Sequence, residues 1–363
     1  MLKILFITPR YYPHIGGVEY VVKSVVEELV KMPIFVQIKV LAGSHSISKV
    51  KIIKKGNMEV IYWPTIVYRE SYFIPKYKLL FEKYLLKLSK DIDIIHIHNV
   101  HSVFAVQSYH VLKKCNYKEK VLVVTPYYHG KAHSFFRNIL WPFWKKMVKE
   151  LLLNADKVHT VSKYEAYLVK KDFNVKAIPI ENGVSDIVFK YKWCPENYVL
   201  YSGRIVKYKN IHILGKLVAI LNKEYGYDLE FKIIGNGPYL KDLVKYLKKI
   251  NIKYSIYGYK PYKEYLEVVS KAKFMGLLSS QESFPQSVNE ANAIGTPVIV
   301  NMPWGINFKN RPRTLVVDLY HQNIIQVANK VQNFMLSCNK QPRPIVKSWK
   351  EIAKMYVEKL YNL

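Results

Sequence analysis

Cysteine is rare in this 363-residue chain, which contains only three. Cys115, Cys194 and Cys338 lie far apart, and none belongs to a CxxC pair or to a cluster with histidine. Such spacing supplies neither a disulfide framework nor a zinc site, so three small buried thiols in a reducing compartment are expected. The sequence thus argues against the disulfide-rich and zinc-stabilised classes of domain.

Long apolar runs are also missing. No stretch of about 18 uninterrupted apolar residues occurs, so a transmembrane helix is not expected. The N-terminal segment MLKILFITPR carries a lysine at position 3, and its apolar run ends at Pro9, which is too short for a signal-peptide core. We therefore expect a cytoplasmic protein.

Acidic residues are few relative to basic ones. The chain has 56 Lys and Arg against 27 Asp and Glu, which gives a formal net charge of +29. This imbalance predicts attraction to a polyanion, and nucleic acid, an anionic membrane face and phosphorylated substrates all qualify. The charge alone does not choose among these partners.

Apolar strand-like runs alternate with helical patterns, which favours parallel sheets built from βα units. We expect an α/β protein of two Rossmann-like domains, doubly wound parallel sheets that face a central cleft. The expected domains are residues 1–183 and 198–345, joined by an aperiodic linker at 184–197, and the tail at 348–363 is expected to form one more amphipathic helix. The predicted strands are Lys3–Thr8, Val36–Leu41, Glu59–Trp63, Asp93–His98, Lys120–Thr125, Lys157–Val161, Ala177–Ile180, Tyr198–Ser202, Leu229–Ile234, Lys253–Tyr257, Phe274–Leu278, Pro297–Val300 and Thr314–Val317.

In the first half, candidate functional residues follow strand ends. Gly16 and Gly17 lie where a loop enters the first helix, and glycines there let backbone N–H groups approach an anion. His129 follows the strand KVLVVT and could donate to a sugar hydroxyl or to a developing charge. His96 and His98 point to one face of a strand and are interpreted as structural, whereas the roles of His101 and His133 stay open.

In the second half, basic residues follow the strand YVLYSG. Gly203-Arg204 ends that strand and Lys209 comes five residues after the arginine. A guanidinium and an ammonium at this place can neutralise a diphosphate, although a solvated basic loop is the plainer alternative. The segment Gly235-Asn236-Gly237-Pro238 predicts a tight turn into a helix that starts near Pro238, and we interpret it as structural.

The most specific pattern is SSQESFPQSVNEANAIGTPV at 279–298. Glu282 lies where a strand meets a loop, and Glu290 lies on the following helix, eight positions further on. Carboxylates in such a crevice accept hydrogen bonds from vicinal sugar hydroxyls, and without partners they would be costly to bury. The backbone N–H groups of Gln286 and Ser287, at the start of that helix, could hold a phosphate.

These motifs, taken in order, resemble the family 4 glycosyltransferases of the GT-B fold over nearly the whole chain. Glu282 and Glu290 have the E-x7-E spacing of the family. The other matching elements are Gly16-Gly17 with Glu19, His129, Asn182-Gly183-Val184, Gly203-Arg204 with Lys209, and Ala291 followed by Gly295-Thr296-Pro297-Val298.

The resemblance implies a metal-independent, anomer-retaining hexosyltransferase that uses a UDP- or GDP-linked sugar as donor and needs no other cofactor. Arg204 and Lys209 would stabilise the departing diphosphate, where charge develops. Glu290 would hold the ribose hydroxyls, and Glu282 and His129 would contact the transferred sugar. The further donor-binding residues would be Gly16, Gly17, Gly203, Phe284, Gln286 and Ser287. The C-terminal helix at 348–363 would pack back on the first domain, as in similar proteins.

Three positions depart from the family's pattern. Phe284 is followed by Pro285 where many relatives have glycine, which removes one N–H donor. Asn210 replaces the commoner glycine after Lys209, and NMPWGI at 301–306 replaces a glycine-rich segment. Two other readings remain: a basic nucleic-acid-binding protein, and an inactive relative that acts as a scaffold. The basic residues are spread over both halves without a known recognition motif, so no specific nucleic acid is expected.

An anionic membrane surface is a further expected partner, with a lipid-linked sugar, a glycan or a protein as acceptor. In WPFWKKMVKELLL, the residues Trp141, Trp144, Val148, Leu151 and Leu152 share one side of a helix while lysines gather on another, which is typical of an interfacial helix. A second stretch, 72–90, also mixes aromatic residues with lysines. An ordinary amphipathic helix that faces the core is the alternative.

Overall fold

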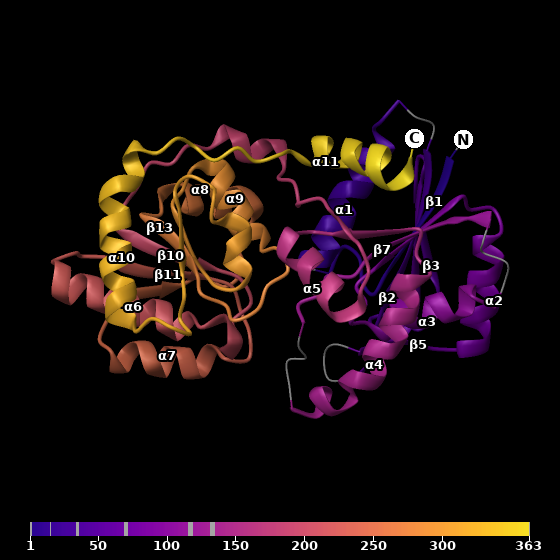
Figure 1. Ribbon diagram of the computed structural model, residues 1–363, viewed down its shortest axis with the longest axis horizontal. Helices are drawn as coiled ribbons and strands as arrows, with labels where there is room; N and C mark the ends of the chain where they lie inside the picture. The colour runs from indigo at the N-terminus through magenta and orange to yellow at the C-terminus, as the bar shows by residue number, and fades with distance from the viewer. Residues whose placement is uncertain are drawn as a thin grey trace. The chain divides into compact units, whose positions relative to one another are not determined.

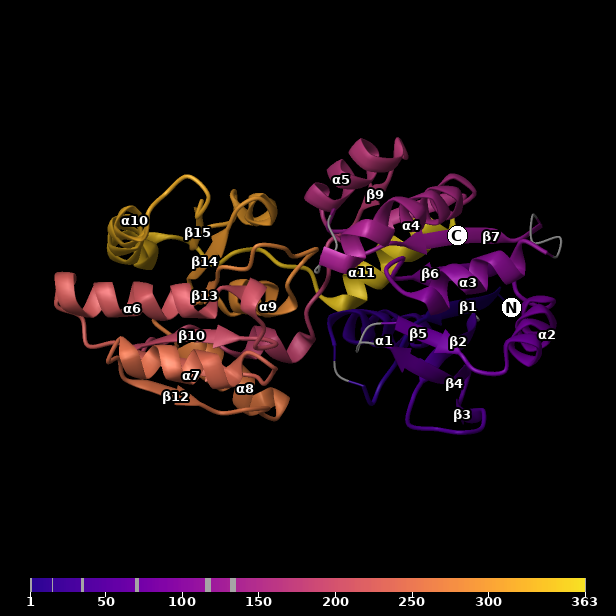
Figure 2. The same cartoon turned by 90° about the horizontal axis from the view of Figure 1, so that it is seen from below.

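A computed structural model of the chain describes residues 2–14, 16–33, 36–68, 72–114, 119–130 and 135–362. The chain forms two compact units (Figures 1 and 2). Unit 1 comprises Met1–Asn182 together with Trp349–Leu363, and unit 2 comprises Gly183–Ser348. Each unit is an α/β domain with its own sheet.

The sheet of unit 1 has the strand order β3-β4-β2-β1-β6-β7-β8-β9, with β5 paired to β4. Neighbouring strands are parallel except where β3 and β5 pair with β4. Chain order therefore reverses beside β1, as in a doubly wound sheet. The elements are β1 (Leu2–Thr8), α1 (Gly17–Val30), β2 (Val36–Ser44), β3 (Lys51–Lys55), β4 (Met58–Tyr68), β5 (Tyr72–Pro75), α2 (Lys78–Ser89), β6 (Ile94–His98), α3 (Val103–Leu112), β7 (Val121–Thr125), α4 (Phe135–Leu153), β8 (Lys157–Thr160), α5 (Lys163–Phe173), β9 (Ile178–Pro179), α11 (Trp349–Tyr356) and the π-helix η6 (Val357–Tyr361).

The two faces of this sheet bury different kinds of side chain. Because strand residues alternate, Leu5, Ile97 and Val124 face α2, α3, α4 and α5 and join one hydrocarbon cluster with them. On the other face, His96 forms hydrogen bonds with Tyr361 of the C-terminal segment and with Thr125, and α11 packs beside α1. Figure 1 shows α11 above the strands of unit 1 and α3 below them.

Helix α4 gives a correction to the sequence analysis. Val148, Leu151 and Leu152 are buried in the hydrocarbon cluster of unit 1, and Trp141 and Trp144 pack against it. The indole N–H of Trp144 donates to the carbonyl of Val100 at 2.8 Å. This face of α4 cannot meet a membrane, so the interpretation of an interfacial helix is wrong here and the core-facing alternative holds. Helical periodicity identifies an apolar face but not what covers it.

The sheet of unit 2 has the order β12-β11-β10-β13-β14-β15, and its pairs are parallel. This is the strand order of dinucleotide-binding Rossmann domains, with the reversal between β10 and β13. Helix α6 contacts α7 and α10, and α8 contacts α9. The elements are η2 (Asp186–Lys190), β10 (Tyr198–Ser202), η3 (Lys207–Lys209), α6 (Ile211–Tyr225), β11 (Glu230–Ile234), α7 (Leu240–Lys249), β12 (Tyr254–Ile256), α8 (Tyr262–Lys271), β13 (Phe274–Leu277), α9 (Gln286–Ile294), β14 (Val298–Asn301), η4 (Trp304–Phe308), β15 (Thr314–Val317), α10 (Ile324–Ser337) and η5 (Cys338–Lys340).

The segment 184–197, which its aperiodic sequence suggests as a linker, lies within unit 2. The N–H of Cys194 donates to the carbonyl of Ser270 at 2.9 Å, and the indole of Trp193 donates to the carbonyl of Ala272 at 2.8 Å. The segment lacks periodicity because it bonds to the end of α8 rather than forming a helix of its own beyond η2. Within the described ranges, no helix combines the length and apolarity that a membrane span requires.

Candidate active site

The strand order of unit 2 marks the place of a site. Ligands of doubly wound sheets bind outside the carboxyl ends of the strands, at the point where strand order reverses. In unit 2 this point lies between β10 and β13, which are followed by Gly203-Arg204 and by Ser279–Glu282. The motifs selected from the sequence therefore leave the sheet at its switch point.

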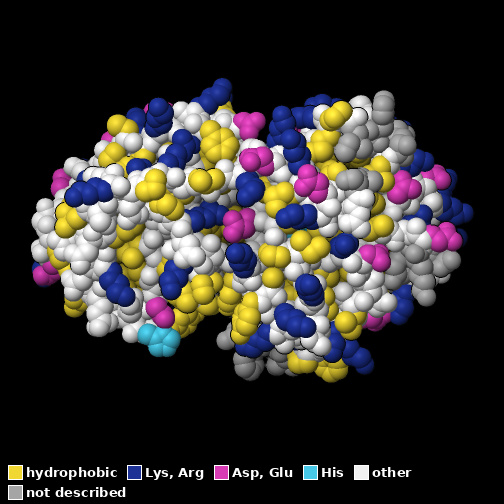
Figure 3. Space-filling model, turned by 45° about the horizontal axis from the view of Figure 1, so that its top comes forward, with side chains coloured by type: hydrophobic (Ala, Val, Ile, Leu, Met, Phe, Trp, Pro, Cys, Tyr) yellow, Lys and Arg dark blue, Asp and Glu magenta, His cyan; other side chains and the backbone are white. Residues whose placement is uncertain are grey.

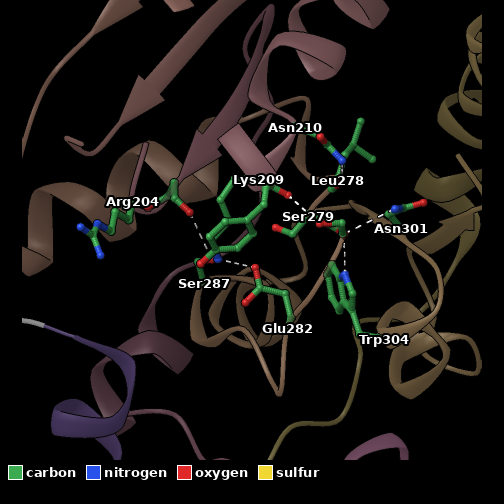
Figure 4. A network of polar contacts seen from close by, with 12 residues as sticks. Arg204, Lys209, Asn210, Leu278, Ser279, Glu282, Ser287, Asn301 and Trp304 are labelled. Atoms are coloured by element: carbon green, nitrogen blue, oxygen red, sulfur yellow. Dashed lines mark hydrogen bonds and ion pairs between the residues drawn. The ribbon is translucent and has the colours of Figure 1, made fainter. Parts of the chain in front are cut away.

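Lys209 and Glu282 meet at this point as an ion pair, although 73 positions separate them in the chain. Their side chains keep only 14% and 13% of their surface exposed. Burial alone would lower the pKa of Lys209, but the Glu282 carboxylate outweighs burial and raises the pKa above that of an ordinary lysine. The ammonium therefore stays charged. Figure 4 shows the pair at the centre of a polar network.

Arg204 lies beside this pair without joining it. Its side chain is exposed, and Figure 4 shows the guanidinium directed away from Lys209 and Glu282. Its backbone carbonyl accepts a hydrogen bond of 2.9 Å from the hydroxyl of Tyr201. The structure brings Lys209 and Glu282 together as the motif suggests, and it leaves the arginine head group turned outward.

The glycines of the two neighbouring loops allow a close approach of backbone. A Cβ atom on Gly235 would lie 1.9 Å from the carbonyl oxygen of Gly203, and one on Gly237 would lie 2.2 Å from that of Ile205. Gly203 and Gly235 also have φ values of 151° and 143°, which disfavour other residues. The structural interpretation of Gly235 and Gly237 is supported. Helix α7 begins at Leu240, two residues after the expected Pro238.

Helix α9 starts at Gln286, with Pro285 as its N-cap. Gln286 and Ser287 are thus the first two helical residues, whose N–H groups have no partner within a helix. The side-chain amide of Gln286 donates to the carbonyl of Gly183 at 2.8 Å, and the hydroxyl of Ser287 approaches the carbonyl of Ser202 at 3.4 Å. Both side chains fix the start of α9 against neighbouring backbone, so contact with an anion would come from their N–H groups.

Glu290 is buried in the second turn of α9, and two tyrosines of α8 hold its carboxylate. The hydroxyl of Tyr262 donates to Oε1 at 2.8 Å, and that of Tyr265 donates to Oε2 at 3.0 Å. Burial raises the pKa of Glu290 to about 7, although these hydrogen bonds and one from Gln286 act to lower it. The sequence analysis missed both tyrosines. Their i, i+3 spacing puts them on one face of a helix, but nothing in the sequence relates that face to Glu290.

The backbone that follows β13 accepts hydrogen bonds from residues at which the sequence departs from the family's pattern. The indole of Trp304 and the amide of Asn301 both donate to the carbonyl of Ser279, at 2.8 and 3.4 Å. Asn210 occupies a left-handed position with φ of 54°, which asparagine tolerates, and its amide donates to the carbonyl of Leu278 at 3.0 Å. The irregular segment 301–306 therefore supports the loop that carries Glu282.

Phe284 is oriented toward the protein interior rather than toward a ligand. Its ring stacks on Phe308 with centroids 5.1 Å apart, and the guanidinium of Arg311 lies over both rings. Arg311 also donates to the side chains of Asn289 and Asn292, at 2.9 and 3.1 Å. Any donor contact of Phe284 would therefore come from its backbone.

In unit 1, Gly16 and Gly17 begin helix α1, and they differ in what surrounds them. A Cβ atom on Gly16 would lie 2.2 Å from the carboxylate of Glu19, whereas nothing lies within 4 Å of one on Gly17. Arg10 Nε forms an ion pair of 2.6 Å with Glu19, whose side chain is buried. A side chain at position 16 would therefore displace the Glu19 carboxylate that pairs with Arg10, whereas Gly17 leaves open space beside the loop.

His129 is half-buried just beyond the end of β7, where the sequence analysis expects it. Its imidazole stacks on that of His101, with centroids 4.2 Å apart and planes 6° apart. The ring of His101 in turn stacks on Trp141 at 5.3 Å. His101 thus supports the ring of His129, and His133 lies outside the described residues.

His96 and His98 are fully buried in unit 1, in agreement with a structural role. Burial lowers the pKa of both well below the usual histidine value. A third buried histidine, His159, was not singled out from the sequence, and burial lowers its pKa to about 4. These rings are neutral at ordinary pH. They contact Thr125 and Tyr361, and His98 also lies 3.4 Å from the hydroxyl of Tyr127, at the start of the loop of His129.

Two Rossmann-like units, the second with the strand order of a nucleotide-binding domain, define the GT-B class of fold. Known families match both halves of the chain. The model described as "Glycosyltransferase Family 4" matches residues 15–186, and the one described as "Glycosyl transferases group 1" matches residues 186–334. The chain belongs to the family 4 glycosyltransferases of the GT-B fold, and it is a glycosyltransferase.

Individual relatives are distant. An uncharacterized glycosyltransferase of Methanocaldococcus jannaschii is 25% identical over 86% of this chain and 80% of its own length. An N-acetylgalactosaminyltransferase of Campylobacter jejuni, named for an undecaprenol-diphosphate-linked substrate, is 26% identical over 46% of this chain and 43% of its own.

Solved structures share the fold at lower sequence identity. Sucrose-phosphate synthase of Thermosynechococcus elongatus superposes with a TM-score of 0.75 at 19% identity, covering 100% of this chain and 98% of that one. The Anabaena protein HepE, in complex with UDP and glucose, gives 0.69 at 13% identity and covers 100% of both chains.

Proposed function

We propose that this glycosyltransferase transfers a sugar, with retention of the anomeric configuration, from a nucleoside diphosphate sugar held at the switch point of unit 2. The observation that carries the proposal is the buried Lys209–Glu282 pair at the ends of β10 and β13. A charged pair at the strand ends of a nucleotide-binding sheet supplies an ammonium for a diphosphate and a carboxylate for sugar hydroxyls.

Stabilisation of the leaving diphosphate would come from three sources. Lys209 is charged and nearly buried, so its attraction to a phosphate is little weakened by water. The first N–H groups of α9, at Gln286 and Ser287, offer a helix N-terminus to the anion. Arg204 is exposed and can swing its guanidinium toward the phosphates. These groups would replace a divalent metal, and full activity in EDTA is the expected result.

Three further side chains would hold the donor's two sugars. Glu290 would accept from the ribose hydroxyls, because its two carboxylate oxygens offer four lone pairs and only three hydrogen bonds, from Tyr262, Tyr265 and Gln286, use them. Glu282 would contact the transferred hexose once the diphosphate draws Lys209 toward itself. His129 and the Gly16-Gly17 loop of unit 1 would contact the same sugar and the phosphate.

The donor is proposed to carry uracil or guanine, with a UDP-linked hexose as the first to test. The crystallised HepE contains UDP and glucose, and its fold is shared by this chain. A thermal-shift screen of UDP, GDP and ADP with their sugar conjugates tests the proposal, since a ligand that binds only the folded state raises the melting temperature. A clear rise with one nucleotide is expected. No rise with any of them, together with binding to nucleic acid, would favour the nucleic-acid reading instead.

The acceptor is proposed to be membrane-borne, with a lipid-linked sugar favoured over a free glycan or a protein. The undecaprenol-linked substrate named for the Campylobacter relative supports this choice. Lys and Arg side chains are spread over the visible face of the molecule rather than gathered in one stripe (Figure 3), which suits a diffuse anionic surface better than a nucleic-acid groove.

With α4 excluded, the contact with the membrane is proposed to use the exposed apolar residues Ile66, Ile74, Tyr77, Leu79 and Leu80, which we call the α2 patch. Ile66 and Ile74 pair across β4 and β5, and Leu79 and Leu80 lie in the first turn of α2 with 75% and 56% of their surface exposed. Lys76 and Lys78 flank them. Apolar side chains among lysines are typical of a surface that rests on anionic lipid.

Co-sedimentation with phosphatidylglycerol–phosphatidylcholine vesicles tests the α2 patch. Binding is expected to grow with the anionic fraction and to fade with salt. The double substitution Leu79→Gln and Leu80→Gln should reduce the bound fraction several-fold. Ile325→Gln with Leu336→Gln, a pair equally exposed on α10 of unit 2, should leave it unchanged. An equal decrease of the vesicle-bound fraction in both double variants would contradict a role of the α2 patch in membrane binding.

A further inference from the structure

Glu165 is a fully buried carboxylate to which neither the sequence motifs nor the proposed chemistry gives a role. It lies in the first turn of α5, where its own N–H donates to Ser162 Oγ, the N-cap, at 3.1 Å. A carboxylate without water around it is costly, and the protein must compensate it with hydrogen bonds. Its partners therefore show what it is there to hold.

The partners are backbone N–H groups of two different loops. Oε1 accepts from the N–H of Tyr128 at 2.6 Å, and Oε2 accepts from the N–H of Val161 at 2.9 Å. The N–H of Tyr127 is a further donor to the same carboxylate. One side chain thus joins the loop that follows β7 to the end of β8.

The residue before His129 has a second anchor on the same helix. The hydroxyl of Tyr128 donates to the carboxylate of Asp172, and it also approaches the carbonyl of Gly130 at 3.3 Å. Lys145 of α4 pairs with Asp172 at 2.9 Å and keeps that carboxylate in place. The residues on both sides of His129 are therefore tied through Tyr128.

The loop needs such support because its backbone is unusual. Tyr127 has φ of 52°, a left-handed conformation that is unfavourable for a bulky residue and persists only when neighbouring groups hold it. The imidazole of His129 then lies flat on His101, with planes 6° apart. A shift of the Tyr127–Tyr128 backbone would move the ring of His129 off this stack.

We propose that Glu165 is the positioning residue of the His129 loop: it holds the backbone of Tyr127 and Tyr128 in the conformation that presents His129 to the transferred sugar. The inference rests on the proposed function of His129. Glu165 lies behind the loop and does not touch the substrate. It acts by keeping a sugar-binding side chain in one place, which matters because small displacements of a reacting group lower turnover strongly.

The substitution Glu165→Gln tests this role, because the amide keeps the volume of the carboxylate. Its NH2 group replaces one acceptor oxygen, so one of the loop N–H groups faces another donor. Turnover is followed as release of nucleoside diphosphate from the nucleotide sugar that gives the largest thermal shift. We expect kcat to fall roughly 10- to 100-fold while the donor KM stays within about twofold, since unit 2 holds the nucleotide.

A control variant and a double-mutant cycle with His129 complete the test. Glu150→Gln removes a carboxylate from an ion pair on the surface of α4 and should keep the parent's kcat. His129→Ala should lose at least as much kcat as Glu165→Gln, and the double variant should lose no more than His129→Ala alone, because Glu165 acts through His129. A merely structural Glu165 would lower the yield of folded protein without this non-additivity.

The outcomes separate the inference from the proposed function. Parent-like kcat in Glu165→Gln beside a large loss in His129→Ala overturns the role of Glu165 alone. Parent-like kcat in His129→Ala removes the role of His129 and the inference with it. Additive losses in the double variant also overturn the inference. If Glu165→Gln does not fold, Glu165→Asp, which keeps the carboxyl group but shortens the reach by one methylene, takes its place in the same cycle.

Discussion

Units 1 and 2 share a strand order that reverses beside their first strand, yet the largest groups of buried polar side chains in the two units differ in kind. Unit 2 places charged side chains at the ends of its strands, where Lys209 meets Glu282 and Glu290 meets two tyrosines. Unit 1 buries neutral rings and a hydroxyl on the face of its sheet that the C-terminal segment covers. Charges that face a site remain able to exchange their partners for a ligand, whereas neutral groups buried under the C-terminal segment hold the fold.

The neutral groups of unit 1 form a hydrogen-bond chain whose direction the geometry fixes. His159 Nε2 lies 3.0 Å from the carbonyl of Ile180, which only accepts, so this nitrogen carries the proton. In a neutral ring Nδ1 then accepts, and it receives the hydroxyl proton of Thr125 at 2.8 Å. Thr125 in turn accepts from His96 Nε2 at 2.8 Å, which leaves His96 Nδ1 to accept from the hydroxyl of Tyr361 at 2.9 Å. The C-terminal segment is thereby bound to the strands.

The largest effect is expected from removing a charged group of unit 2. Lys209→Ala should lower kcat by roughly 10²-fold or more, about 2.7 kcal/mol in the barrier, because the ammonium stabilises charge that develops on the diphosphate. Lys207→Ala, an exposed neighbour in the same 3-10 turn, is the matched control and should stay near the parent. Similar rates in the two variants, measured as nucleotide release, would argue against Lys209 as the phosphate ligand.

An intermediate effect is expected from removing a neutral group of the hydrogen-bond chain in unit 1. Thr125→Val removes the hydroxyl that both accepts from His96 and donates to His159. Each buried polar group left without a partner costs about 1–3 kcal/mol, so a loss of about 2–4 kcal/mol in the free energy of unfolding is expected. Thr160 is equally buried, and its hydroxyl has no partner within the described part of the chain. Thr160→Val should therefore change the free energy of unfolding, measured with denaturant, only slightly. An equal loss in the two variants would contradict the hydrogen-bond chain through Thr125.

The smallest effect is expected from the titration of Glu290, whose protonation should make nucleotide affinity depend on pH. Burial raises the pKa of Glu290 to about 7, so its protonated form is favoured by folding. Its contribution to stability is complete below pH 4.5 and is lost as pH rises through 7. A ribose diol donates to the ionised carboxylate, so nucleotide affinity should fall several-fold between pH 7.5 and pH 6. The substitution Glu290→Gln should remove the part of this pH dependence that is due to Glu290, and titration calorimetry at the two pH values measures it. An unchanged dependence of nucleotide affinity on pH in this variant would contradict the assignment.

The fold could be read from the sequence wherever apolar strands end at recognisable turns. Strand β3 was missed because Lys51–Lys55 is exposed at every position and has no buried side to reveal it. Strand β5 was missed because the stretch 72–90 was considered as a single segment, although it becomes a strand and then helix α2. The face of α4 was visible in the sequence, but its partner lies in α3 and the sheet, far along the chain.

The candidate site was readable where a single segment carries its spacing, as between Glu282 and Glu290. Partners contributed by other segments were not readable. Tyr262 lies 28 positions before the carboxylate that it holds, and Glu165 lies 37 positions after Tyr128. The outward orientation of Arg204 also leaves no trace in the sequence. Spacing within one turn or helix is encoded locally, whereas contacts between elements depend on the topology of the sheet.

Hydrogen exchange with and without a nucleoside diphosphate tests the central claim most directly, because it shows where the nucleotide binds. With the nucleotide that gives the largest thermal shift, slower exchange is expected at 203–210 and 279–290, the two segments that leave β10 and β13. Strands β6 and β7 of unit 1 should exchange as before. Protection confined to unit 1, or none in either segment at a saturating concentration, would contradict a donor site at the switch point of unit 2.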